Sequence, residues 1–179
     1  MPDERTNKPH AIIVMGVSGC GKSSVGEKLA EALHLTFVEG DALHPAANVE
    51  KMSKGIPLTD DDRMPWLDRI GEDMRASLEK SEGIIVSCSA LKRIYRDRLR
   101  EAAGGNLFFA YLEGSRALLT KRMGERKGHF MPVSLLESQL ATLEVPTGEP
   151  GVVTVDIDDT IDGIATSALR GLKALGVTA

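Results

Sequence analysis

The chain has 179 residues, of which 42% are hydrophobic and 27% charged, and its formal net charge is −4. This length and composition are typical of one globular domain. No apolar run approaches the roughly 20 residues that a membrane-spanning helix needs. The charged start "MPDERTNKPH" lacks the apolar core of a secretory signal. We therefore expect a cytoplasmic protein that binds neither membrane nor nucleic acid.

Short β-rich runs alternate with longer helical runs along the chain. The five expected strands are residues 11–16, 36–40, 83–89, 107–114 and 151–157. Several are near-continuous apolar runs, which is typical of strands covered on both faces. The alternation predicts an α/β fold of three layers, in which a parallel five-stranded sheet lies between helices.

Two connections are longer than a single crossover helix requires. Residues 41–83 predict two helices, one from Pro45 and one over about 62–80. Later, "KGHFMP" (127–132) separates two helical runs. We predict one domain over 1–179 with two local embellishments, a helical segment at about 44–80 and a segment at about 121–132.

The stretch "GVSGCGKSS" (16–24) fits the pattern G-x-x-x-x-G-K-[ST] between an apolar strand and an amphipathic helix. Its glycines let backbone N–H groups approach phosphate oxygens, and the helix directs its unsatisfied amides at the same anion. Lys22 can reach the β- and γ-phosphates, and the Ser23 hydroxyl can coordinate Mg²⁺. The predicted ATP-binding residues are Gly16, Val17, Ser18, Gly19, Cys20, Gly21, Lys22, Ser23 and Ser24.

Other classes of P-loop protein fit this sequence poorly. A GTPase needs N-K-x-D on a late strand, but the only Asn-Lys, at residues 7–8, precedes the first strand. Motor and transporter ATPases need an apolar strand that ends in Asp beside the P-loop strand. "GIIVSCS" (83–89) ends in Ser and Cys, and "VVTVD" is expected in the wrong place. A small-molecule phosphotransferase remains.

Asp41 lies where the second strand ends, at the edge of the sheet where ligands gather in open α/β folds. There its carboxylate can orient an attacking hydroxyl and accept its proton. The alternative is a turn or helix-capping residue.

Ten Lys or Arg against four Asp or Glu make residues 92–127 basic, which indicates either a solvated helix face or an anion-binding surface. Arg122 and Arg126 are four residues apart on one helix face, from which they could close over the triphosphate and neutralise charge in the transition state. Solvated helix arginines are the alternative. Lys92 follows the third strand and could bind an anionic acceptor.

Four consecutive motifs resemble the gluconokinases, a family of P-loop small-molecule kinases. They are "MGVSGCGKSS", "EGDALHPAANVEKMSKGIPLTDDDRMPWL", "CSALKRIYRDRLR" and "RKGHFMPVSLLESQLATLE". The resemblance implies ATP-dependent phosphorylation of D-gluconate on its terminal C6 hydroxyl to give 6-phosphogluconate. It also implies a single P-loop kinase domain over 1–179 with an adenylate-kinase- or shikimate-kinase-like fold, in which residues 44–80 bind the acceptor and residues 121–132 form a lid. Mg²⁺ as cofactor and a homodimer are implied as well.

A sugar acid needs donors for its hydroxyls and a cation for its carboxylate. Besides Asp41, the predicted substrate-binding residues are His44, Asn48, Lys51, Arg63 and Lys92, and each could instead be a surface residue. Trp66 is expected to pack in the core. Two alternatives stay open: a kinase of another small hydroxylated acceptor such as shikimate, and a regulator that binds ATP without transferring phosphate.

Overall fold

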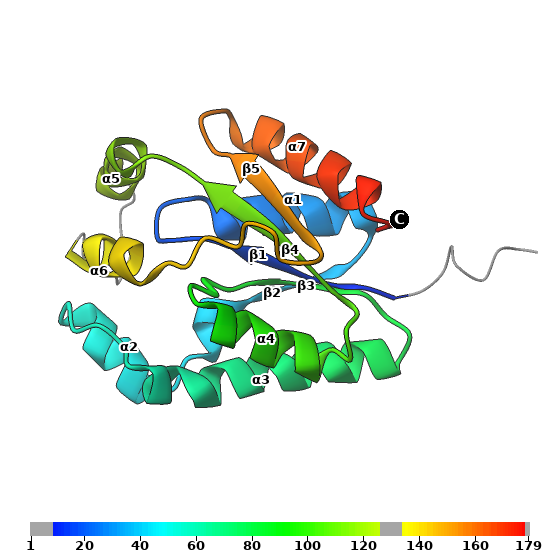
Figure 1. Ribbon diagram of the computed structural model, residues 1–179, viewed down its shortest axis with the longest axis horizontal. Helices are drawn as coiled ribbons and strands as arrows, with labels where there is room; N and C mark the ends of the chain where they lie inside the picture. Colours follow the sequence, from blue (N-terminus) through cyan, green and yellow to red (C-terminus); the bar gives the residue numbers. More distant parts are fainter. Residues whose placement is uncertain (1–8, 126–133, 178–179) are drawn as a thin grey trace, which may run out of the picture.

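The computed structural model describes residues 9–125 and 134–177, which form a parallel five-stranded sheet of order β2-β3-β1-β4-β5 (Figure 1). The strands are β1 (Ala11–Met15), β2 (Thr36–Glu39), β3 (Ile84–Ser87), β4 (Leu107–Glu113) and β5 (Val152–Asp156). The helices are α1 (Lys22–Leu33), the 3₁₀ turn η2 (Gly40–Leu43), α2 (Ala46–Ser53), α3 (Asp60–Glu79), α4 (Arg93–Ala102), α5 (Arg116–Glu125), α6 (Ser134–Thr142) and α7 (Ile161–Ala174). The predicted class and all five strands are confirmed, each strand shorter by one to three residues.

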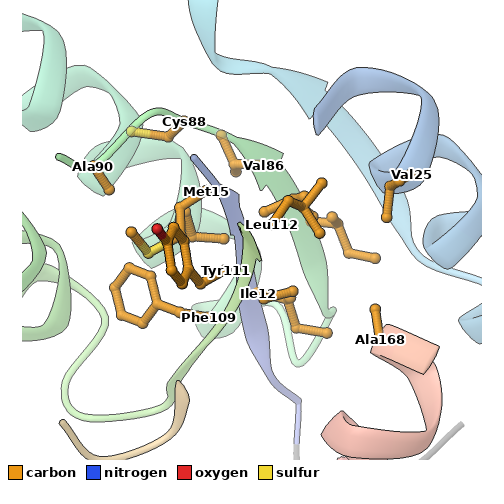
Figure 2. Packing of buried hydrophobic residues seen from close by; sticks show 14 of the residues in the cluster. Ile12, Met15, Val25, Val86, Cys88, Ala90, Phe109, Tyr111, Leu112 and Ala168 are labelled. Atoms are coloured by element: carbon orange, nitrogen blue, oxygen red, sulfur yellow. The ribbon is translucent and has the colours of Figure 1, made fainter. Parts of the chain in front are cut away.

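Helices cover both faces of the sheet. α1 and α7 pack together on one face, and α3 and α4 pack together on the other (Figure 1). Because side chains alternate along a strand, Ile12 and Leu112 point toward α1 and α7 (Figure 2). Met15 and Tyr111, which are paired neighbours on β1 and β4, point to the opposite face (Figure 2). β1 is buried along its whole length, as its apolar run predicts.

The carboxyl ends of the strands form the functional edge of the sheet. β1 is flanked by β3 and β4, so its following loop lies near the point where the chain changes direction across the sheet. α2, α5 and α6 lie beyond this edge (Figure 1). β5 pairs with β4 and not with β1, which confirms that "VVTVD" occupies the wrong place for a motor ATPase.

The two helices expected between the second and third strands are α2 and α3. α3 begins at Asp60, two residues earlier than predicted, because Thr59 and Asp62 form a capping box. His44 is extended before Pro45, as predicted. The "KGHFMP" segment and Arg126 of the predicted lid lie outside the described residues, and α5 and α6 flank them. Among the helices that the structure describes, none has the length and apolar character to cross a bilayer.

A close contact fixes the end of β2 against β3. An added Cβ at Gly40 would lie 1.8 Å from the carbonyl oxygen of Ser87. The Gly40 amide donates to the Ser87 hydroxyl (3.1 Å), and the Trp66 indole donates to the Gly40 carbonyl (2.8 Å). The position therefore requires glycine, and this contact sets where the next residue, Asp41, can lie.

A buried ion pair fastens the loop after β3 to the segment before β5. The Arg96 guanidinium is fully buried and donates to both carboxylate oxygens of Glu149, at 2.9 and 2.6 Å. It also donates to the carbonyls of Ala90 (2.7 Å) and Glu144 (2.9 Å). Ala90 has a positive φ of 46°, which an L-residue adopts rarely, so Arg96 stabilises a strained loop. Its bonds lower the pKa of Glu149.

Gly40→Ala should destabilise the fold by at least about 1–3 kcal/mol, because the backbone must move to accommodate the new methyl group. Thermal unfolding measures this loss, and steady-state kinetics should reveal a lower kcat from the displaced Asp41. Gly104→Ala is the comparison, since a Cβ there meets open space and only its positive φ of 63° is unfavourable. Unchanged kcat in Gly40→Ala would contradict the assigned constraint.

Arg96→Met should lower the free energy of unfolding by about 3–5 kcal/mol, because the buried Glu149 carboxylate loses its two bonds from Arg96 and keeps only Arg100 as a partner. Arg98→Met is the matched control on the same helix, where an exposed pair with Asp68 is expected to contribute about 0–1 kcal/mol. Urea unfolding of the two variants measures the difference. Equal losses would contradict a structural role specific to Arg96.

Candidate active site

The P-loop leaves the first turn of α1 open to an anion. Gly21 precedes α1 in the left-handed conformation (φ 93°), and no side chain caps the helix. In contrast, Thr59 and Thr160 cap α3 and α7 through their hydroxyls. The uncapped amides at α1 can therefore bind phosphate oxygens. The Lys22 ammonium donates to the Val17 carbonyl (3.2 Å), and the Cys20 side chain is fully buried, so Cys20 can contribute through its backbone.

Glu39, which was not predicted as a site residue, accepts a hydrogen bond from Ser23, the residue predicted to coordinate Mg²⁺. Its carboxylate accepts one hydrogen bond from the Ser23 hydroxyl and another from the Ser87 hydroxyl (2.6 Å). Glu39 ends β2, two residues before Asp41, and pairs in register with Ser87 of β3. Strand-end position was a signal that could have identified it. Ser23 and Glu39 together place two oxygen donors of different charge beside the phosphate site.

A cavity of about 420 Å³ extends from the P-loop to the connection between β5 and α7. Lys22, Ser23 and Asp41 line one part of it, and Asp159, Thr160 and Ile161 line another. Arg122 also lines this cavity, and its guanidinium donates to the carbonyls of Ile157 (2.6 Å) and Asp159 (3.1 Å). Arg122 is thus held by the β5–α7 connection, whereas its predicted neighbour Arg126 lies outside the described residues.

A second, smaller cavity of about 30 Å³ adjoins the first. Asp41, Ser18 and Lys22 line both cavities. The other residues around the smaller cavity are His44, Met52, Pro57, Leu58, Arg63, Trp66, Ser89, Ser138 and Gln139. Asp41 therefore lies where the two cavities meet.

His44 is held in the smaller cavity by two neighbours. Its ring stacks on Trp66 with 3.9 Å between centroids and 17° between planes. Asn48, which is buried, contacts the His44 Nδ1 at 3.2 Å. Burial, and then the charge of Arg63, lowers the pKa of His44 to about 4. Trp66 is 1% exposed, so the expected core position is confirmed, and it also supports the His44 ring.

The three predicted cations of the acceptor site have different partners. Arg63 lines the cavity, is buried and donates to the Tyr95 hydroxyl (2.9 Å). Lys92 binds Asp60 (2.9 Å), which also accepts a bond from Tyr95. These bonds, Tyr95 first, lower the pKa of Asp60.

Neither Lys92 nor Lys51 lines the smaller cavity. The Lys51 ammonium binds Asp62 at 2.8 Å. The hydrogen bond from Lys51, and to a lesser extent the one from the Thr59 amide, lowers the pKa of Asp62 to about 2. The structure thus brings Asp41, His44 and Arg63 together around the smaller cavity. It pairs Lys51 and Lys92 with carboxylates in the first turn of α3.

Much of the basic segment over residues 92–127 is neutralised by ion pairs. The pairs are Lys92–Asp60, Arg93–Asp97, Arg96–Glu149, Arg98–Asp68, Arg100–Glu149 and Arg116–Glu137. Most of these side chains therefore serve packing between elements or lie paired at the surface.

Gln139 is a second site residue that the sequence analysis missed. Its side-chain oxygen accepts a hydrogen bond from the Ser18 amide of the P-loop (2.7 Å). Since Gln139 belongs to α6, this bond joins the helix after the predicted lid to the loop that binds phosphate. No local sequence signal distinguishes Gln139 from a solvated helix residue.

Known proteins resemble this chain over most of its length. A family profile described as an AAA domain matches residues 12–146. The gluconokinase of Gluconobacter oxydans is 47% identical over 169 residues, with 93% of each chain covered. The thermoresistant gluconokinase of Escherichia coli is 44% identical, covering 94% of this chain and 97% of its own. The crystal structure of a gluconokinase from Sinorhizobium meliloti superposes with a TM-score of 0.87 at 56% identity, covering 95% of each chain. The chain belongs to the gluconokinase family.

Proposed function

We propose that the protein is an ATP-dependent gluconokinase that phosphorylates D-gluconate at C6 to give 6-phosphogluconate. The observation that carries this proposal is the position of Asp41, which lines both the P-loop cavity and the smaller cavity beside it. A protein that only binds ATP needs no carboxylate at such a junction. The names of the relatives, which are gluconokinases at 47% and 44% identity, supply the acceptor.

In the proposed reaction, ATP occupies the larger cavity with its phosphates on the P-loop amides and Lys22. Gluconate binds on the acceptor side of Asp41, where the side chains around the smaller cavity must move apart to admit it, with its C6 hydroxyl at Asp41. The hydroxyl oxygen attacks the γ-phosphorus, the bond from that phosphorus to the bridging oxygen breaks, and ADP leaves. Asp41 orients the hydroxyl and accepts its proton. Phosphoryl transfer depends mainly on such positioning and on stabilisation of charge.

The donor set beside the P-loop fits Mg²⁺, a hard cation that is usually held by one or two carboxylates together with substrate phosphates. Ser23 and Glu39 are the residues that would hold it, because their oxygen atoms already lie within hydrogen-bond contact of each other. Bound there, the ion would supply charge neutralisation at the β- and γ-phosphates. Glu39 extends the sequence-based prediction, which named Ser23 alone.

At the far end of the larger cavity, we propose that Arg122 and residues 159–161 contact the nucleoside. The bonds from Arg122 to the Ile157 and Asp159 carbonyls hold its guanidinium there. A role for Arg122 and Arg126 in neutralising the transition state stays a prediction. So do a homodimer, a cytoplasmic location and a single kinase domain over 1–179, which we expect from the sequence and the family.

For gluconate itself, Arg63 is the cation best placed for the carboxylate, since it lines the smaller cavity and its side-chain partner is the neutral Tyr95 hydroxyl. His44 and Asp41 then remain for hydroxyl groups. Lys51 and Lys92 act at longer range, because each is bound to a carboxylate of α3. Asn48 is a buried neighbour of His44 and no part of the cavity wall.

The test is release of ADP from Mg-ATP with gluconate, shikimate, AMP or no acceptor, with the product identified by 6-phosphogluconate dehydrogenase. We expect turnover with gluconate, and Asp41→Asn should lower kcat by about 10²–10⁴-fold while ATP binding is retained. Asp61→Asn is the control, since Asp61 is exposed and lines neither cavity. Turnover with another acceptor alone would overturn the assigned substrate. Full activity in Asp41→Asn would overturn the assigned role.

Glu39→Gln should raise the Mg²⁺ concentration needed for half-maximal activity by roughly 10–100-fold, because one metal-directed carboxylate is lost. The measurement is kcat/KM for gluconate at saturating ATP, determined as a function of Mg²⁺ concentration. Glu113→Gln provides the control at the end of the neighbouring strand β4, where the side chain is exposed and lines neither cavity. Identical titrations of Glu39→Gln and wild type would exclude Glu39 from the metal site.

A further inference from the structure

The Asn48 amide is oriented by a backbone carbonyl. Its Nδ2 lies 2.8 Å from the carbonyl oxygen of Asp62 and 3.2 Å from the Nδ1 of His44. A carbonyl oxygen can only accept, so the nitrogen of the amide, and not its oxygen, faces Asp62. The same nitrogen then donates its second proton toward His44. Asn48 is 4% exposed, which makes loss of either bond unfavourable.

The tautomer of His44 follows from this orientation. Because Nδ1 accepts the bond from Asn48, the ring proton of the neutral imidazole is on Nε2. The ring lines the smaller cavity and one of its faces is covered by Trp66. Among the described residues, no hydrogen-bond partner is found for Nε2. This N–H is therefore the group of His44 left to meet a ligand.

The surroundings keep the imidazole uncharged. Burial, and then the charge of Arg63 of α3, which lines the same cavity, lowers the pKa of His44 to about 4. The other charged groups around the ring are Asp41 of η2 and Lys22 of α1, which line the cavity. Behind Asn48, the charges of Lys51 and Asp62 compensate each other in an ion pair.

We propose that Asn48 is a positioning residue that holds His44 as the Nε2–H tautomer, and that His44 thereby donates an uncharged hydrogen bond to an oxygen atom of the sugar acid. The inference rests on the proposed gluconokinase function and assigns separate tasks within its acceptor site. Arg63 supplies the positive charge for the carboxylate. His44 supplies a donor that does not change with pH near neutrality, and Asn48 acts only through His44.

The tautomer can be measured directly in the wild-type protein. Long-range ¹H–¹⁵N spectra of protein labelled at histidine distinguish a protonated from an unprotonated ring nitrogen, and His44→Gln assigns the signals of residue 44. We expect an unprotonated Nδ1 and a protonated Nε2 from pH 8 down to about 5.5. At the lower end of this range an ordinary histidine, which titrates near 6.5, would already be charged. A proton on Nδ1, or a charged ring at pH 7, would overturn the proposal.

Kinetics test the donor. Gln can place an amide N–H where the Nε2–H of His44 lies, so His44→Gln should keep the KM for gluconate within about threefold. His44→Leu lacks a donor and should raise this KM by about three- to tenfold, the effect of one neutral hydrogen bond. The KM for ATP should stay the same in both. A gluconate KM in His44→Leu equal to that of wild type would overturn the proposal.

Asn48→Asp tests the positioning role. A carboxylate at this position accepts a hydrogen bond from a protonated Nδ1 and thereby stabilises the imidazolium, so the KM for gluconate should become dependent on pH between about 5.5 and 8. Wild type should show no such dependence. Asn106→Asp, in the connection between α4 and β4, is the matched control. A flat profile in folded Asn48→Asp would overturn the role of Asn48; if that variant does not fold, the wild-type spectra decide.

The two proposals fail separately. The spectra need no acceptor, so the tautomer can be established even where gluconate is not the substrate. Turnover with another acceptor alone would overturn the proposed function and leave the spectra to be judged by themselves. Phosphorylation of gluconate together with a proton on Nδ1 would support the function and overturn this inference.

Discussion

The Glu39 carboxylate is the interaction on which the arrangement of the site depends. It receives hydrogen bonds from Ser23 at the start of α1 and from Ser87 at the end of β3, while itself ending β2. Three segments from distant parts of the chain are thereby fixed at one edge of the sheet. Gly40 then passes so close to the Ser87 carbonyl that Asp41 follows in a determined position. The phosphate-binding loop and the carboxylate that faces it are thus parts of one bonded unit.

The sequence predicted features that depend on local pattern. Apolar runs identified the strands. The P-loop could be recognised because its glycines, its lysine and its hydroxyl group all lie within nine residues. The position of Asp41 followed from a general property of parallel sheets, where carboxyl ends of strands share an edge. The start of α3 differs from the prediction by two residues, because the Thr59 cap fixes it and the apolar periodicity of the helix does not.

Features that depend on contacts between distant segments were not predictable in the same way. Glu39 gains its role through register with Ser87, and Gln139 through a bond to the P-loop from a helix far along the chain. Lys92 carries the same charge as Arg63, yet packing of α4 against α3 pairs Lys92 with Asp60. Arg96 and Arg98 are both arginines of one short helix, but only the first faces the interior. Composition does not distinguish such residues.

The ion pairs around the acceptor cavity have a consequence for how turnover ends. Lys22 and Arg63 are the described cations that line the smaller cavity without a carboxylate partner, and of these two only Arg63 lies outside the P-loop. One such charge matches a monocarboxylate. A phosphorylated sugar acid carries two further negative charges and meets the Asp41 carboxylate, while Lys51 and Lys92 are already neutralised. Among the described residues, the new phosphate therefore has Lys22 of the P-loop as its cation, and the acceptor side adds none beyond the Arg63 that met the substrate. The same pairing that narrows the choice of acceptor thus adds no charge that would retain the product.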